Sequence, residues 1–281
     1  RRRKRSSLRR AALPRSNAER VATHGAASGP VGAAPACSAA PTRSHLRTGR
    51  VSHSLIVHVG QHKTASTSIQ AFAVAMRGQL ESDGICYPVA GTVEHYPAHH
   101  SIAWEARGDT RHDPNAGGLA EALAEIDRSG CPTGLLSSED FSWLAGRPER
   151  LTAFHARLTA DGWPVRYVAF HRRPESAIPS LYAELLKHGL TCDYDHFRRT
   201  FMRRLEFETH GDWFFDLNPR RLSRRWQVAT GQGLELHSFD AAVAGRGVLP
   251  EFWRIVGASE AIQAASPTAP RMNTRPERPA A

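Results

Sequence analysis

The stretch that most constrains the fold of this chain is residues 54–76, which read SLIVHVGQHKTASTSIQAFAVAM. Its first part, Leu55 to Val59, is a short and mostly β-branched apolar run, typical of a buried parallel strand. From Ser66 the apolar residues recur at helical spacing, so a helix is predicted to follow at once. The polar turn between them would direct backbone N–H groups, the positive end of a helix and the Lys63 ammonium toward one point. Such a point favours a phosphate group.

The same order of strand, charged turn and helix occurs twice more along the chain. Residues 134–140 predict a strand with acids at its carboxyl end, followed by a helix over residues 150–160. Residues 165–171 predict another strand, followed by an arginine pair and a helix over residues 175–188. Repeated units of this kind predict a three-layer α/β/α fold of the P-loop type, with a central, mostly parallel sheet. Functional groups are then expected at the carboxyl ends of the strands.

Shorter patterns complete the predicted domain. Strands are predicted at residues 84–88 and 234–239, and helices at residues 119–126 and 249–256. Residues 194–230 read as mainly helical, with an aromatic-rich interruption and a proline restart.

Charge and composition divide the chain into one core and two tails. With 41% apolar residues the chain supports one well-filled core, assigned to residues 51–260. Residues 1–50 contain 12 of the 37 Lys and Arg residues but one of the 27 acids, so the net charge of +10 belongs to them. They are predicted to be a disordered basic tail: a targeting segment, a nucleic-acid-binding arm or an untranslated extension. Residues 261–281 are predicted to be a loose tail, and nucleic acid is not expected as a partner of the core.

The cysteines and the apolar runs limit where such a protein works. Cys37, Cys86, Cys131 and Cys192 lie tens of residues apart, with no histidine at metal-ligand spacing. Free thiols, no metal site and a cytoplasmic location are therefore expected. No apolar run reaches the roughly 20 residues of a membrane-spanning helix, so no membrane span is expected.

The loop after the first strand differs from the P-loop of nucleoside triphosphatases. That pattern places a glycine directly before its lysine, whereas Lys63 follows Gly60 by three positions. A shorter loop suits one phosphate or a phosphosulfate better than a triphosphate. Thr64, Ser66 and Thr67 add hydroxyl donors at the helix start. The alternative is a helix that Ser or Thr merely caps.

A second candidate anion site follows the strand at residues 165–171. Arg172 stands at the strand end and Ser180 about two helical turns later, so both can face one ligand at the start of the helix. A guanidinium fork and a hydroxyl suit a terminal phosphate. The alternative is an arginine pair on a solvent-exposed turn.

Taken together, the two motifs resemble the sulfotransferases that use 3′-phosphoadenylyl sulfate (PAPS). The nearest resemblance is to bacterial sulfotransferase-like proteins with a His-x-Gly-x-His-Lys-Thr-x-x-Thr-Ser-Ile-Gln start and a Ser-Ser-Glu strand end, and it covers about residues 54–258. It implies a nucleotide-binding transferase that moves a sulfonate from PAPS to an acceptor hydroxyl or amine without a metal. The acceptor that it favours is a carbohydrate or a small metabolite. By resemblance, the donor-binding residues are Gly60, His62, Lys63, Thr64, Ala65, Ser66, Thr67, Arg172 and Ser180.

Sulfuryl transfer also requires a cation at the leaving oxygen and a base at the acceptor. Lys63 is the candidate cation, because charge grows on the bridging oxygen as its bond to sulfur breaks. Glu139 is the first candidate base, followed by His99 and His100. A helix-capping role for Glu139 and a solvated histidine pair are the alternatives. Three tryptophans could stack an acceptor or the adenine, or pack in the core: Trp104, Trp143 and Trp213.

One residue departs from the family pattern. The family usually has glycine where this chain has Ala65. A left-handed backbone would make alanine costly there, whereas a helical backbone would favour it. The sequence leaves both open.

Two other functions fit parts of the sequence. A P-loop kinase would use residues 135–140 as a strand whose terminal acid holds Mg²⁺ beside ATP. A nucleic-acid-binding protein would act through residues 1–50. A sulfotransferase, unlike a kinase, should bind 3′,5′-adenosine bisphosphate without a metal.

Overall fold

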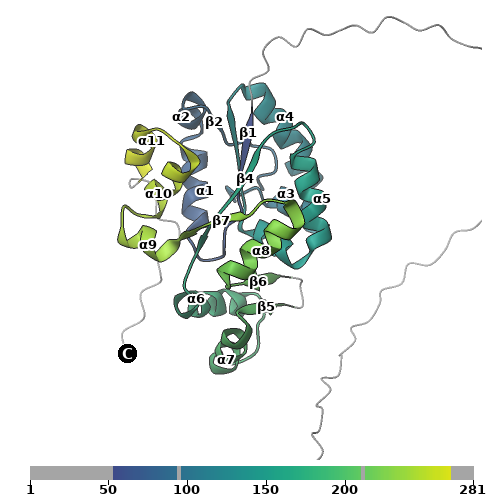
Figure 1. The fold of residues 1–281 in the computed structure, drawn as a ribbon, viewed down its shortest axis with the longest axis vertical. Coiled ribbons are helices and arrows are strands. Elements are labelled where there is room, and N and C mark those ends of the chain that lie inside the picture. Colours follow the sequence, from purple (N-terminus) through teal and green to yellow (C-terminus); the bar gives the residue numbers. More distant parts are fainter. Residues whose placement is uncertain (1–52, 94–95, 210–212, 267–281) are drawn as a thin grey trace, which may run out of the picture. The chain divides into compact units, whose positions relative to one another are not determined.

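Parallel strands form the centre of the computed structural model, which describes residues 53–93, 96–209 and 213–266 (Figure 1). Within these residues the main sheet has five strands in the order β2-β3-β1-β4-β7, each parallel to its neighbours. The strands are β1 (Ser54–His58), β2 (Ile85–Cys86), β3 (Thr133–Ser137), β4 (Val165–His171) and β7 (Leu234–Ser238). The predicted parallel sheet is confirmed.

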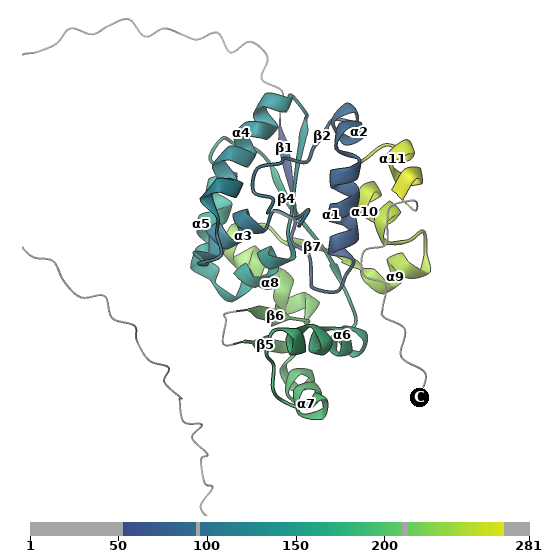
Figure 2. The same cartoon turned by 180° about the vertical axis from the view of Figure 1, so that it is seen from behind.

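Helices cover both faces of this sheet, as the two opposite views show (Figures 1 and 2). One face carries α1 (Ser66–Ala75), α2 (Arg77–Ser82), α9 (Phe239–Ala244), α10 (Val248–Val256) and α11 (Glu260–Ala265). The other carries α3 (His100–Arg107), α4 (Leu119–Ser129), α5 (Pro148–Leu158) and α8 (Pro219–Thr230). Side chains of β1 alternate between the layers: Ile56 packs with Phe72 and Phe252 on the first face, while Leu55 and Val57 join the core of the second. The predicted three-layer α/β/α architecture is therefore confirmed.

The segment after β4 follows its prediction in its helices and departs from it between the second and third of them. It forms α6 (Pro174–Lys187), α7 (Tyr194–Arg204) and an antiparallel hairpin of β5 (Glu206–Glu208) and β6 (Phe214–Asp216) before α8 begins. The mainly helical interpretation of residues 194–230 is wrong at this hairpin. Each strand has three residues, too few to display an alternating pattern, and the pair is held by the burial of Phe214 and Phe215 against the core.

The sheet order brings the three turns with candidate functional residues to one edge. Strand β1 lies between β3 and β4, and His58 at its end pairs with Ser137 of β3 and Val168 of β4. The chain leaves β1 toward β3 on one side and returns to β4 on the other, which makes this edge a topological switch point. The loop after β1, the 3₁₀ helix η2 (Glu139–Gly146) after β3 and the turn after β4 therefore meet.

Several expectations concern the ends of the domain. The predicted tail of residues 1–50, Cys37 and residues 267–281 lie outside the described residues. The predicted tail over residues 261–281 begins too early, because α11 is capped by the Ser259 hydroxyl and buries Ile262. No helix among the described residues is long and apolar enough to cross a membrane. The described cysteines are free thiols, and this part of the chain holds no cluster of three or more potential metal ligands.

Candidate active site

The loop that joins β1 to α1 has a left-handed backbone at three positions. The φ angles are 55° at Gly60, 70° at Lys63 and 64° at Ala65. At Gly60 a Cβ atom would lie 2.9 Å from the Cα of Glu139, so glycine allows the loop to approach η2. Across the described residues, no backbone N–H from Gly60 to Thr67 donates a hydrogen bond to another protein group. A run of unpaired amides at a helix start is a concave donor site for an anion.

Ala65 occupies the position where the sequence left two backbone conformations open. It is the N-cap of α1 with φ 64° and ψ 22°, which is left-handed, and its side chain makes no capping bond. This conformation costs a non-glycine residue roughly 1–2 kcal/mol. The loop therefore carries backbone strain at the point where the helix begins.

Replacing Ala65 with glycine is expected to stabilise the protein. Relief of the strain outweighs the larger entropy of an unfolded glycine, so we expect a gain of about 0.5–1 kcal/mol and a Tm about 1–4 °C higher. Thermal unfolding followed by circular dichroism measures the change. The matched control is Ala183→Gly on the exposed side of α6, where glycine should cost about 1 kcal/mol. A lower Tm in both variants would contradict the strain at Ala65.

The Lys63 ammonium is engaged by a carboxylate that the sequence analysis did not single out. Its Nζ lies 2.7 Å from Oε2 of Glu184 on α6. The same carboxylate lies 3.1 Å from Nζ of Lys187 and 3.5 Å from Nε2 of His188. Burial tends to raise the pKa of Glu184, but hydrogen bonds from Lys63 and Lys187 outweigh it and hold that pKa at about 2. Glu184 is therefore ionised, and Lys63 rests beside a negative charge.

Arg172 connects the second predicted anion site to the first. Its Nη1 lies 3.3 Å from Oγ of Ser180 and 3.4 Å from the carbonyl oxygen of Lys63, and its Nε lies 3.2 Å from Oγ of Ser176. Arg173 turns away to pair with Asp240 at 3.2 Å and is 73% exposed. The structure thus brings Arg172 and Ser180 against the loop that carries Lys63, and Glu184 follows Ser180 by one turn of α6.

Glu139 opens η2 directly beside the loop, two residues beyond the end of β3. Ser138 caps η2, so Glu139 is not its cap. Oε2 of Glu139 accepts a hydrogen bond of 2.9 Å from Nε2 of Gln70 on α1. Burial tends to raise the pKa of Glu139, but the nearby His100 and His62 and the bond from Gln70 lower it overall. Glu139 is a carboxylate at neutral pH, as a general base must be.

The two neighbouring histidines have different surroundings. His99 is fully buried, its Nδ1 accepts from the Ser137 N–H at 3.0 Å and its Nε2 lies 3.0 Å from the carbonyl oxygen of Pro88. Burial lowers the pKa of His99 to about 4. Backbone groups occupy both of its ring nitrogens, so we do not propose it as a base. His100 is partly exposed, and its Nδ1 lies 2.9 Å from Oγ of Ser138, which leaves Nε2 for a substrate.

The other loop side chains mainly shape the turn. The buried Thr64 hydroxyl donates to the carbonyl oxygen of Gln61 at 2.6 Å, so only its backbone N–H is left to face an anion. His62 stacks on Trp143 with ring centroids 5.0 Å apart, and burial lowers the pKa of its imidazole. Ser66 and Thr67 begin α1 with their backbone N–H groups directed out of the helix start.

The predicted tryptophans divide between core and rim. Trp143 is buried in a stack between His62 and Trp213, with 5.0 Å between the ring centroids of the two indoles. Trp104 and Trp213 are partly exposed, and the Arg111 guanidinium lies 4.7 Å from the ring centroid of the first and 5.8 Å from that of the second. Trp143 is therefore a core residue, whereas Trp104 and Trp213 border the site.

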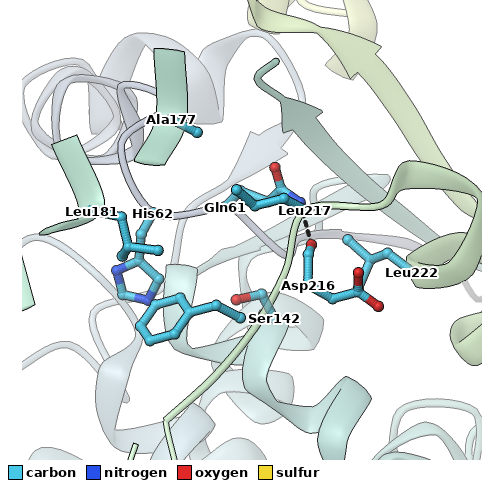
Figure 3. Close-up of a pocket in the computed structure, with 9 residues that line it drawn as sticks. Gln61, His62, Ser142, Ala177, Leu181, Asp216, Leu217 and Leu222 are labelled. Carbon is cyan, nitrogen blue, oxygen red and sulfur yellow. Dashed lines mark hydrogen bonds between the residues drawn. The ribbon is translucent and has the colours of Figure 1, made fainter. Parts of the chain in front are cut away.

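A small cavity lies behind the loop, and Figure 3 shows the residues that line it. Its volume is about 20 Å³, room for about one water molecule and far too little for a nucleotide. Gln61 closes one wall by donating from Nε2 to the carbonyl oxygen of Asp216 at 3.0 Å (Figure 3). This bond ties the loop to β6. The cavity is therefore a small gap behind the loop and not a substrate-binding pocket.

The fold defines an α/β protein with a parallel central sheet, and the loop after its first strand is the candidate anion site. No protein-family model matches the chain, and no curated protein matches it. Among solved structures, a sulfotransferase from Alicyclobacillus acidocaldarius is similar, with 14% sequence identity and a TM-score of 0.42 over 81% of this chain and 88% of that chain. The functional assignment therefore depends on the geometry of the site.

Proposed function

We propose that this chain is a PAPS-dependent sulfotransferase, which transfers a sulfonate from PAPS to an acceptor hydroxyl or amine. The observation that carries the proposal is the contact between the two anion sites, where Nη1 of Arg172 lies 3.4 Å from the carbonyl oxygen of Lys63. A ligand with two anionic groups separated by one ribose suits two adjoining sites. PAPS has this form, with a 5′-phosphosulfate and a 3′-phosphate.

The donor set fits both ends of such a nucleotide. The unpaired amides between Gly60 and Thr67 suit the phosphosulfate oxygens. The Arg172 fork and the Ser180 hydroxyl suit the 3′-phosphate. The Lys63 ammonium would leave Glu184 and stabilise the negative charge on the oxygen that bridges phosphorus and sulfur.

Glu139 is the residue best placed to accept the proton of the acceptor. As the new bond from the acceptor oxygen to sulfur forms, the bond from sulfur to the bridging oxygen breaks, and the acceptor proton passes to the Glu139 carboxylate. His100 is the second candidate for this role. A carbohydrate or a small metabolite is the proposed acceptor, with the exposed parts of Trp104 and Trp213 beside its path.

Binding of 3′,5′-adenosine bisphosphate to the 281-residue protein tests the proposal. Isothermal titration calorimetry without added metal is expected to give a micromolar Kd, about −8 kcal/mol. Arg172→Ala should weaken binding about 30-fold or more, because truncating one partner of a charged contact costs about 2–5 kcal/mol. Arg173→Ala is the matched control and should bind normally, since Arg173 faces Asp240.

A different ligand preference would overturn the assignment. Tight binding of ATP with Mg²⁺, with no binding of the bisphosphate, would favour a kinase instead. Equal losses in the Arg172→Ala and Arg173→Ala proteins would remove the role given to Arg172.

A further inference from the structure

The candidate base has a buried amide partner whose orientation is determined by its neighbours. Gln70 lies in the middle of α1 and is 2% exposed. Its Nε2 lies 2.9 Å from Oε2 of Glu139 and 3.3 Å from Oγ of Ser137. An ionised carboxylate only accepts hydrogen bonds, so the NH₂ group of Gln70 must face Glu139. Both N–H donors of that group are therefore used.

A second contact holds the amide from behind. Oγ of Ser137 also lies 2.8 Å from Nδ1 of His58, and both residues are fully buried. Burial lowers the pKa of His58 to about 4, so its imidazole is neutral at physiological pH. The amide cannot rotate away from Glu139 without losing its bond to Ser137 inside the core.

We propose that Gln70 is the positioning residue for the base: it holds Oε2 of Glu139 and so leaves Oε1 to take the proton of the acceptor. This inference rests on the proposed sulfotransferase function. The loop also lies close to the Glu139 backbone, because a Cβ atom on Gly60 would lie 2.9 Å from the Cα of Glu139. Gln70 therefore determines which way the Glu139 side chain points.

The proposal predicts a change in the pH dependence of the reaction. A donated hydrogen bond favours the ionised carboxylate, so removing it should raise the pKa of Glu139, and the rate should then fall at a higher pH as acid is added. Other titratable groups interact with Glu139, and none is changed by substituting Gln70: His58, His62, Tyr87 and His100.

The test compares Gln70→Met, which keeps the length but lacks the donor, with Gln70→Glu, which keeps the shape but adds a carboxyl group. Gln70→Met should lower kcat about tenfold or more, as expected for a hydrogen bond to a charged group, with the KM for PAPS nearly unchanged. The acid limb of the pH–kcat profile should move to higher pH in Gln70→Met and further in Gln70→Glu, where two carboxyl groups share one proton. A merely structural role would lower the Tm but leave the acid limb in place, and would overturn the proposal.

Two further measurements separate this inference from the proposed function. In a Glu139→Gln background, adding Gln70→Met should change kcat by less than about twofold, because the two residues act as one unit. In the free protein, NMR titration of ¹³C-labelled carboxyl groups should show the Glu139 resonance shifting at higher pH in Gln70→Met. If wild-type protein fails to bind the bisphosphate, the proposed function fails; if the Glu139 titration is unchanged in Gln70→Met, the positioning role fails.

Discussion

Glu139→Gln is expected to lower kcat by about 10²–10⁴-fold, the usual contribution of a general base, with little change in the affinity for 3′,5′-adenosine bisphosphate. The substitution preserves the shape of the side chain and its contact with Gln70, so the fold should be unaffected. The amide cannot accept the proton that leaves the acceptor. Transfer from PAPS to an acceptor that the wild-type protein uses measures kcat, and calorimetry measures the binding.

The pH profile and a set of substitutions test the role given to Glu139 against His100. Because the pKa of Glu139 is lowered in the folded protein, the wild-type rate should stay constant through neutral pH and fall only in the acid range, as pH drops through that pKa. His100→Gln and the exposed control Glu149→Gln complete the set. Retained activity in Glu139→Gln, with loss in His100→Gln, would transfer the role to His100.

Lys63→Met is expected to lower kcat by about 10²–10³-fold, the effect of removing one preorganised group that stabilises transition-state charge. The substitution keeps much of the length of the side chain but removes the ammonium that we propose stabilises the bridging oxygen. Glu184 retains Lys187 at 3.1 Å, so its carboxylate is not left without a cation. Rapid-quench measurement of sulfonate transfer at saturating PAPS isolates this step from donor binding.

Lys187→Met is the matched control for that prediction. Lys187 is the other lysine that contacts Glu184, and it lies three residues after Glu184 on α6. Its side chain is 70% exposed. The kcat of Lys187→Met should stay close to that of the wild type, because screening makes an exposed pair of little consequence. An equal loss in both variants would mean that neutralising Glu184, rather than charge stabilisation by Lys63, supports the rate.

Much of the fold could be predicted because its patterns are local. The strand predicted at residues 165–171 coincides with β4, and the helix predicted from Ser66 coincides with α1, since an apolar run and a helical period each extend over several residues. The β5–β6 hairpin could not be predicted in this way. Its aromatic residues acquire their pattern only through burial against the core.

The candidate site, like the fold, has residues that local sequence patterns predict and residues that depend on distant contacts. Lys63 and Arg172 both follow parallel strands, so the fold class predicts that they lie at the same edge of the sheet. Their contact depends also on β1 and β4 being neighbours, which the structure shows. Gln70 and Glu184 were missed because their partners lie far away in sequence, although Glu184 stands four residues after Ser180 on the same helical face. The conformation of Ala65 was undecidable, because alanine is common in helices and the strained φ comes from the loop as a whole.

If Lys63 binds PAPS as proposed, its ion pair with Glu184 makes donor binding an exchange of one anion for another. An arriving phosphosulfate must displace a carboxylate that lies 2.7 Å from the ammonium, so the measured donor affinity is the difference between two attractions. After displacement, Glu184 would still lie beside Lys187 and His188, and these contacts lower the free-energy cost of the exchange. In the protein without a ligand Glu184 thus shields the lysine, and inorganic anions in the buffer should bind Lys63 less readily than an isolated ammonium.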